Sequence, residues 1–272
     1  MNMPLSMTEL LEAEAGNYAQ AKQFIGNTFE LLGDFDCAYE RLTASMRFSG
    51  LYDPQTQEEQ AFVSALFLFG FCRRQLAIGL STLMRGYRAD SAMHLRRAIE
   101  ASAFAVRINK YPELAAVWAN AWNEYEAYRS AFRPQEVFPH LKHPDYNPTI
   151  CRLKKQYDFC SKMMHGGIFG IAGHYFKESS SESGAPPFAI EFFDLPADHS
   201  LLSSLFWIFD AHLSILQLAS EIIRPYEPDS GATSNVRLNS IEAKLNVHRG
   251  AWIERLPAIK KALNEISRAQ RD

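Results

Sequence analysis

The sequence predicts an all-α protein, a multi-helix bundle with one irregular loop or hairpin insertion and a C-terminal helical arm. Two observations carry this prediction. Long apolar stretches of helical character recur along the chain, as at 58–87 and 200–223, and residues 166–198, rich in Gly, Ser and Pro, lack that character. We therefore expect a helical bundle domain over residues 1–228, which contains the non-helical insertion at about 166–198, and an amphipathic arm over 236–272.

Capping and breaking signals delimit the helices of the N-terminal half. Ser6 followed by Glu9 has the form of a capping box and opens the first helix, which the segment GDFD at 33–36 ends. Pro112 lies near the start of the last helix of this half, where proline is tolerated. The helices expected here cover residues 6–32, 37–48, 58–87, 88–110 and 113–132.

Prolines and glycines divide the second half. Four prolines interrupt residues 133–148, which we expect to form an ordered loop. A helix follows over 149–165 and is closed by a pair of glycines. Within the insertion, the alternating apolar residues of 187–196 predict a short strand or hairpin arm, and helix resumes at 200–223.

The arm has apolar residues at every third or fourth position, the pattern of an amphipathic helix, with a kink expected at Pro257. An apolar stripe of this length has to be covered. It packs either on its own bundle or on the same helix of a second chain in a homodimer, and the sequence leaves both open. The residues of the stripe are Leu238, Ile241, Leu245, Trp252, Leu256, Ile259, Leu263 and Ile266.

Composition limits the functional classes. The 272 residues are 47% hydrophobic, enough for a substantial core. The 28 basic and 31 acidic residues nearly balance, which argues against a strong net electrostatic field that would attract nucleic acid or a membrane surface. Four separated cysteines without a CxxC pair indicate a reducing compartment. No signal peptide is evident, and the most apolar run, at 61–71, is shorter than the roughly 20 residues that span a bilayer. We expect a cytoplasmic protein without membrane contact.

Residues 88–107 combine a buried helical pattern with an unusual number of charges. On a helical wheel, Arg96, Glu100 and Arg107 fall on one narrow arc, and the first two are four residues apart and can pair. The structural interpretation is a salt-bridged seam that fixes helix register. The functional alternative is a polar pocket in which Arg96 holds an anion.

A second polar stripe follows in the helix at 149–165. Tyr157, Ser161 and His165 are spaced four residues apart and lie on one face, with His165 near the C-terminus, where the helix dipole favours its charged form. The stripe could be a hydrogen-bonded column, and His165 could be a simple capping group. Without an acid partner or an oxyanion hole, a serine hydrolase is not expected.

These segments together resemble a family of uncharacterised bacterial all-helical proteins. The pattern is an Arg-x3-Glu helix followed by Tyr-x3-Ser-x3-His, and it matches Arg96, Glu100, Tyr157, Ser161 and His165. The family is distantly similar to HEPN domains, helical bundles of defence and toxin–antitoxin systems. That resemblance implies a bacterial stress or defence role, and in many HEPN domains a metal-independent RNase in which four to six residues separate an Arg from the following His and the two meet at a dimer cleft.

Two pairs in this chain have that spacing, Arg88 with His94 and Arg133 with His140, and chance alone accounts for such a number. The second pair lies in the proline-rich loop. The first begins a helix, although its side chains would point about 120° apart on a regular helix. Arg88, His94 and His165 are therefore the candidate catalytic residues, and Arg96, Glu100, Tyr157 and Ser161 the candidate polar core or ligand-binding residues.

No ferritin-type, zinc-protease or nucleotide-binding motif occurs, and we expect no cofactor or metal. We expect a HEPN-like, non-catalytic binding or interaction protein that forms a homodimer and meets RNA or a partner protein. One alternative is a metal-independent RNase that acts through an Arg/His pair. The other is a sensor that holds a small anionic ligand inside the bundle.

Overall fold

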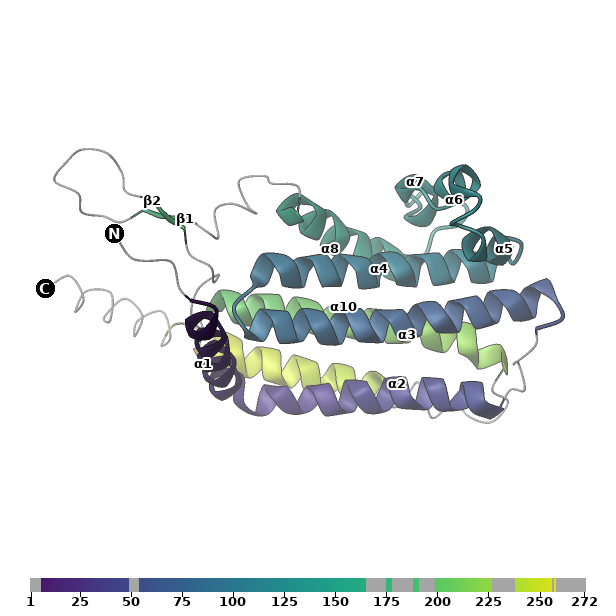
Figure 1. The fold of residues 1–272 in the computed structure, drawn as a ribbon. Helices are drawn as coiled ribbons and strands as arrows, with labels where there is room; N and C mark the ends of the chain where they lie inside the picture. The colour runs from purple at the N-terminus through teal and green to yellow at the C-terminus, as the bar shows by residue number, and fades with distance from the viewer. Residues whose placement is uncertain are drawn as a thin grey trace, which may run out of the picture.

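The computed structural model describes residues 6–48, 54–164, 175–177, 188–190, 199–226, 238–255 and 257, and within them the chain is a packed helical bundle, as predicted. The long helices α2, α3, α4 and α10 run side by side along the molecule, α8 covers α4, and the short helices α5 to α7 gather near one end of α4 (Figure 1). The elements are α1 (Met7–Ile25), η1 (Gly26–Glu30), α2 (Leu31–Phe48), α3 (Gln57–Met84), α4 (Arg88–Lys110), α5 (Leu114–Ala119), α6 (Tyr125–Ala131), α7 (Pro134–Val137), α8 (Pro148–Met164), α10 (His199–Ile223) and η2 (Arg224–Tyr226). A further helix, here called the C-terminal helix, covers residues 238–255.

The first helix begins as predicted but ends earlier. The Ser6 hydroxyl accepts from the Glu9 backbone N–H at 3.3 Å, and the Glu9 carboxylate accepts from the Ser6 N–H at 2.7 Å, so the capping box is present. The predicted break at 33–36 is wrong, because this segment lies in the first turns of α2. The break falls instead at Gly26, whose φ of 55° favours glycine, and a 3₁₀ turn follows it.

The single helix predicted over 113–132 is two short helices, α5 and α6. Turns centred on Asn120 separate them, since its carbonyl accepts from the backbone N–H groups of Asn123 and Glu124. Asparagine competes with helix by favouring such turns. The predicted loop over 133–148 is also interrupted, by the single turn of α7, in which Pro134 occupies the first position.

Helices α3 and α4 pack closely through small residues. A Cβ at Gly79 would lie 3.1 Å from the Cβ of His94 and 3.3 Å from the Ser91 carbonyl oxygen. The thiol of Cys72 donates to the Ala98 carbonyl at 3.1 Å. Ala98 is buried, as are Ala101 and Ala105 of the same helix, and the bond from Cys72 places Ala98 at the contact with α3.

Two helices, α3 and residues 201–223 of α10, are long and apolar enough to cross a membrane by length and composition alone. More than half of each apolar window is buried inside the bundle, which is also the behaviour of core helices in a soluble protein. The length and apolar composition of these helices therefore do not distinguish a membrane span from a core helix.

The described part of the predicted arm packs on its own bundle. Leu238, Ile241, Leu245 and Trp252 are buried and belong to the same hydrophobic core as α2 and α10. The Trp252 indole N–H donates to the Thr28 hydroxyl at 2.9 Å. The apolar positions beyond residue 255 lie outside the described residues, as does any kink after Pro257.

The described part of the insertion contains a short antiparallel hairpin, in which β1 (Tyr175–Lys177) pairs with β2 (Phe188–Ile190). The second strand is part of the segment whose alternation predicts a strand. The other residues of the insertion, the glycine pair after α8 and most of the linker that precedes the C-terminal helix lie outside the described residues.

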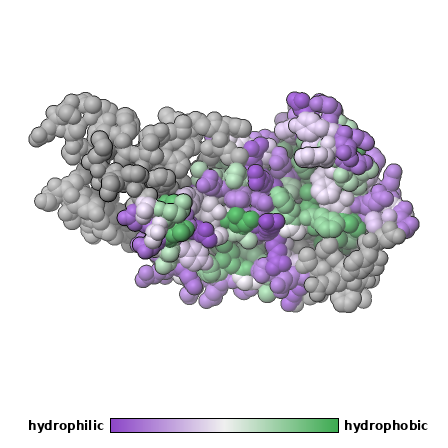
Figure 2. Space-filling model, in the orientation of Figure 1, coloured by the Kyte–Doolittle hydropathy of each residue, from purple (hydrophilic) through white to green (hydrophobic). Residues whose placement is uncertain are grey.

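The outer face of α3 carries exposed apolar side chains. Phe67 is 64% exposed and Phe71 41%, one helical turn apart, and Gly70 lies between them with open space at its Cβ position. Figure 2 shows hydrophobic surface over α3 and α4 among hydrophilic side chains. Two aromatic side chains thus lie exposed, one helical turn apart, on an outer face of the bundle.

Candidate functional site

A polar seam lies where α4 meets α8, and Tyr157 is its centre. The Arg96 guanidinium donates to the Tyr157 hydroxyl at 3.1 Å and lies 5.0 Å from the centre of the ring. The same hydroxyl lies 3.5 Å from the Glu100 carboxylate. Tyr157 therefore joins two side chains that the spacing predicts as a direct ion pair.

The seam is enclosed by apolar and aromatic groups. Tyr157 is only 6% exposed, and its ring centre lies 4.7 Å from that of Phe138. Burial by itself lowers the pKa of Arg96, but the Tyr157 hydroxyl and the Glu100 carboxylate outweigh it, and the pKa is raised overall. Arg96 thus remains a cation held by neighbours on α4 and α8.

The predicted Tyr157–Ser161–His165 column is not assembled from side chains in the part that the structure describes. The Ser161 hydroxyl donates to the backbone carbonyl of Tyr157 at 2.8 Å, a local bond that serine often forms inside helices. His165 lies outside the described residues. Ser161 is consequently a helix residue satisfied within its own turn.

The structure separates the candidate catalytic pair. His94 faces α3, where its Nδ1 hydrogen-bonds the Gln75 side-chain oxygen at 2.8 Å. Arg88 instead lines a pocket of about 100 Å³ between α4, α8 and α10, together with Cys160 and Ser204. The two side chains therefore meet different neighbouring helices, as the wheel predicts.

His94 is also poorly suited to carry charge. Burial at the α3–α4 contact lowers its pKa, and the nearby Arg97 lowers it further, against a smaller opposing effect of Asp90. With Nδ1 bonded to the Gln75 oxygen, the neutral ring has its proton on Nδ1. The geometry is that of a hydrogen bond between helices.

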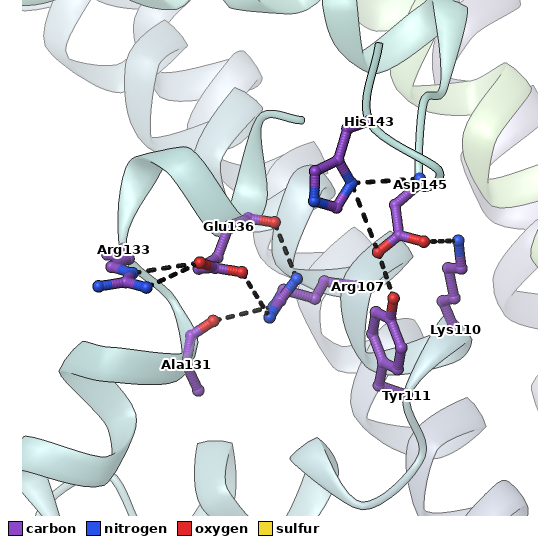
Figure 3. A network of polar contacts seen from close by, with 8 residues as sticks. All are labelled: Arg107, Lys110, Tyr111, Ala131, Arg133, Glu136, His143 and Asp145. Atoms are coloured by element: carbon purple, nitrogen blue, oxygen red, sulfur yellow. Dashed lines mark hydrogen bonds and ion pairs between the residues drawn. The ribbon is translucent and has the colours of Figure 1, made fainter. Parts of the chain in front are cut away.

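A larger polar network, which the sequence does not predict, lies where α4 meets α6 and α7 (Figure 3). Arg107 donates to the carbonyl oxygens of Ala131 and Glu136, both at 2.9 Å, and lies 3.3 Å from the Glu136 carboxylate. Arg133 binds the same carboxylate at 2.9 Å. Arg133, which has the HEPN spacing to His140 in the sequence, is therefore held in an ion pair. These bonds close the end of α6 and the turn of α7 onto α4.

The neighbouring part of the network is centred on Asp145, which accepts from Lys110 and from the Tyr111 hydroxyl (Figure 3). The Lys110 and Tyr111 hydrogen bonds hold the pKa of the Asp145 carboxyl below its usual range, and Asp145 in turn raises the pKa of Tyr111. His143 accepts from the Asp145 backbone N–H at 3.2 Å. Asp145 is thus a clamp between the loop and the end of α4.

Metal ligation finds no support among the residues that the structure describes, because no group of three or more His, Cys, Asp or Glu side chains is placed to hold an ion. The His143 ring and the Asp145 carboxylate lie 3.9 Å apart, without a third side chain of these types beside them among the described residues. His165 and His174 lie outside those residues.

The basic residues of α8 and of the C-terminal helix are largely engaged. Lys154 pairs with Asp158 at 2.5 Å, and Arg249 pairs with Asp210 at 2.6 Å. Arg152 hydrogen-bonds Gln217 at 3.3 Å across a polar pocket of about 300 Å³. These contacts join α8, α10 and the C-terminal helix instead of forming an open basic groove.

No protein-family model, no curated protein and no solved structure matches this chain. The resemblance to HEPN domains therefore stays a prediction that rests on the short motifs alone.

Proposed function

We propose that this chain is a non-catalytic, HEPN-like helical binding protein of a bacterial stress or defence module, and that it acts as a homodimer. One observation carries the proposal. The Arg96 guanidinium, the most prominent candidate for phosphate or anion recognition, is bonded to Tyr157 and lies against its ring, inside the contact between α4 and α8.

An RNase would need a phosphate clamp and a proton-transfer group that face one space. His94 bonds Gln75 on α3, whereas Arg88 faces α8 and α10. Arg133 pairs with Glu136. These side chains do not face one common space, which favours binding over catalysis.

The homodimer would form through the outer face of α3. Phe67 and Phe71 are exposed one helical turn apart, and Gly70 between them in sequence adds no side chain to this face. A two-fold contact buries the same surface patch of both subunits, and two exposed aromatic rings on one helix face offer such a patch. A second copy can therefore cover these rings with the same patch.

The catalytic alternative is tested by RNA cleavage without added metal, on single-stranded and structured RNAs, with the full chain and with Arg96→Ala, His94→Ala and His165→Ala. We expect no cleavage above the background of a mock purification. Cleavage by the wild type that one folded variant loses would refute the proposal and locate the active site.

The dimer is tested by light scattering after size exclusion, on the wild type and on Phe67→Glu/Phe71→Glu. We expect twice the chain mass for the wild type and the chain mass for the variant. Replacement of the equally exposed Tyr125 by glutamate serves as the control, since Tyr125 is 60% exposed on α6. A monomeric wild type, or a variant that stays dimeric, would exclude this interface.

A further inference from the structure

A pocket of about 370 Å³ lies between α1, η1, α2, α3 and α10, on the other side of the bundle core from the polar seam. Its volume is within the range of small-molecule sites. Its wall is predominantly apolar, with aromatic rings contributed by Tyr18, Phe29, Phe35 and Tyr39. None of the candidate residues of the seam lines it.

His212 of α10 lines the same pocket and is the polar group within it that calls for a partner. It is only 5% exposed, and among the described residues neither ring nitrogen has a hydrogen-bond partner. The ring stacks on Phe35 at 4.9 Å and meets Tyr39 edge-on at 5.8 Å. A buried polar group without a hydrogen bond costs about 1–3 kcal/mol, so its presence on a pocket wall points to a ligand.

The charge state of His212 limits the ligand. Burial lowers its pKa to about 3, so the imidazole is neutral near pH 7 and offers one N–H donor and one nitrogen acceptor. A neutral hydroxyl, which can donate and accept, matches either nitrogen.

The remaining charges of the pocket cancel. Asp36 and Arg73 are the carboxylate and the cation that line the pocket, and Arg73 donates to Asp36 at 2.5 Å. With this ion pair made within the protein, the pocket offers no unbalanced charge for an ionic ligand. The aromatic wall in turn favours a flat ring, because offset and edge-on ring contacts add to the gain from apolar burial.

We propose that this pocket is a binding site for a small, neutral aromatic molecule that carries one hydroxyl group, with its ring against Phe35 and Tyr39 and its hydroxyl on His212. The site is independent of the homodimer interface and of the polar seam, and it goes beyond the proposed binding function by naming a ligand class.

Gly33 gives a way to fill the pocket without touching His212. It lines the pocket from α2, and a Cβ at this position would meet no atom within 4 Å. Gly33→Leu therefore adds a side chain at the wall of the pocket without a clash at its Cβ. Gly16 is the matched control, because it also lies inside a helix with open space at its Cβ position and does not line the pocket.

The experiment measures binding of 2-naphthol and of naphthalene to the full chain by fluorescence titration and calorimetry. We expect saturable binding of 2-naphthol with about tenfold preference over naphthalene, which is the effect of one hydrogen bond. His212→Phe keeps a ring against Phe35 but has no hydrogen-bonding nitrogen, and the preference should fall to about one. Gly33→Leu should weaken both probes at least about tenfold by steric exclusion, whereas Gly16→Leu should bind both as the wild type does.

The absence of saturable 2-naphthol binding by the wild type would overturn the proposal. So would an unchanged preference in His212→Phe, or unchanged binding in Gly33→Leu. Circular dichroism and thermal unfolding verify the fold of each variant, and Gly33→Leu tests the pocket even if His212→Phe does not fold. RNA cleavage or a different oligomeric state would leave these outcomes unaffected, so the two proposals fail separately.

Discussion

A single buried hydroxyl, that of Tyr157, links the cation of Arg96 to the carboxylate of Glu100. Its position on α8 means that the two charges of α4 are bonded through another helix as well as lying four residues apart. Truncation of any one of the three removes a hydrogen-bonding contact from a half-buried polar group, and such losses cost more than the bond itself contributes. The seam is therefore expected to act on stability.

Arg96→Ala should lower the free energy of unfolding by about 1–3 kcal/mol, because the Tyr157 hydroxyl loses its donor and the ring loses its cation. The matched control is Arg97→Ala, which removes an exposed arginine from the same helix and should change stability by less than about 0.5 kcal/mol. Urea unfolding followed by circular dichroism measures both. Equal midpoints for the two variants would contradict a structural role for Arg96.

His212 makes stability depend on pH. Its folded pKa of about 3 lies below the usual value of 6.5, so between these values the unfolded chain binds a proton that the folded chain does not. The stability that depends on a neutral His212 is fully present above pH 6.5. As the pH falls through this window, the free energy of unfolding decreases by up to about 1.4 kcal/mol per pH unit.

We expect His212→Phe to remove this slope, so that the variant gains on the wild type steadily as the pH falls from 6.5 to 4. Thermal unfolding at half-unit pH intervals gives the difference, and carboxylates common to both proteins cancel in it. If the stability of the wild type and of the variant changed in parallel with pH, His212 would bind its proton as readily in the folded protein as in the unfolded chain.

At the scale of elements, three backbone and side-chain oxygens bonded to Arg107 fasten α6 and α7 to α4. Both helices are short, seven and four residues, and helices of this length are not stable by themselves in water. Their order is therefore supplied by the contact with Arg107 and by packing of Phe132 and Val137, which are buried.

Arg107→Ala should release this segment, with faster amide hydrogen exchange over residues 125–137 and a loss of about 2 kcal/mol in unfolding free energy. Arg107→Lys should not restore it, since one ammonium cannot reproduce the planar donors that reach all three oxygens. Arg129→Ala on the exposed side of α6 is the control and should leave the exchange unchanged. Unaltered protection in Arg107→Ala would show that packing alone orders the segment.

Sequence reasoning succeeds here where the signals are local. The capping box at Ser6 lies within one helical turn and corresponds to observed hydrogen bonds. Arg96 and Glu100, also one turn apart, both contact the Tyr157 hydroxyl. The end of α1 was missed because a glycine at position 26 and one at 33 look alike in sequence, and only the fold determines which adopts a positive φ.

The polar network at Arg107 could not be predicted for a related reason. Its partner Glu136 is 29 positions away and belongs to a segment in which prolines favour loop. The environment of His212 could not be predicted either, since the sequence shows only a histidine in an apolar helix and does not show that its ring nitrogens lack hydrogen-bond partners within the described part of the chain. Predictions for these residues require the tertiary contacts.

At the scale of the whole molecule, the C-terminal helix completes the core. Trp252 bonds Thr28 and its ring centre lies 5.3 Å from that of Phe24, while Lys244 pairs with Asp34 at 2.7 Å. These partners are more than 200 residues away along the chain. The described part of the arm is thus an integral layer of the bundle, so the chain should unfold in one transition that includes it.

Leu245→Ala should cost about 2–5 kcal/mol, because Leu245 is only 1% exposed and its truncation leaves a cavity against the bundle. Val247→Ala is the matched control on the same helix, since Val247 is 71% exposed and should cost less than about 0.5 kcal/mol. Calorimetry compares the two. A small first transition that Leu245→Ala alone removes would show instead that the C-terminal helix melts apart from the bundle.

The close approach of α3 and α4 at Gly79 has a consequence for thermostable design. Replacement of helical glycines by alanine is a common stabilising step, worth about 0.5–1 kcal/mol each where the new methyl group has room. It has room at Gly16 and Gly70. At Gly79 the same methyl group would lie 3.1 Å from the Cβ of His94 and 3.3 Å from the Ser91 carbonyl oxygen, so α3 and α4 would have to shift by a few tenths of an ångström. In an alanine scan of the helical glycines, we therefore expect stability to rise at the exposed positions and to fall at Gly79, where α3 meets α4. Gly79 is the glycine that a stabilised library should keep.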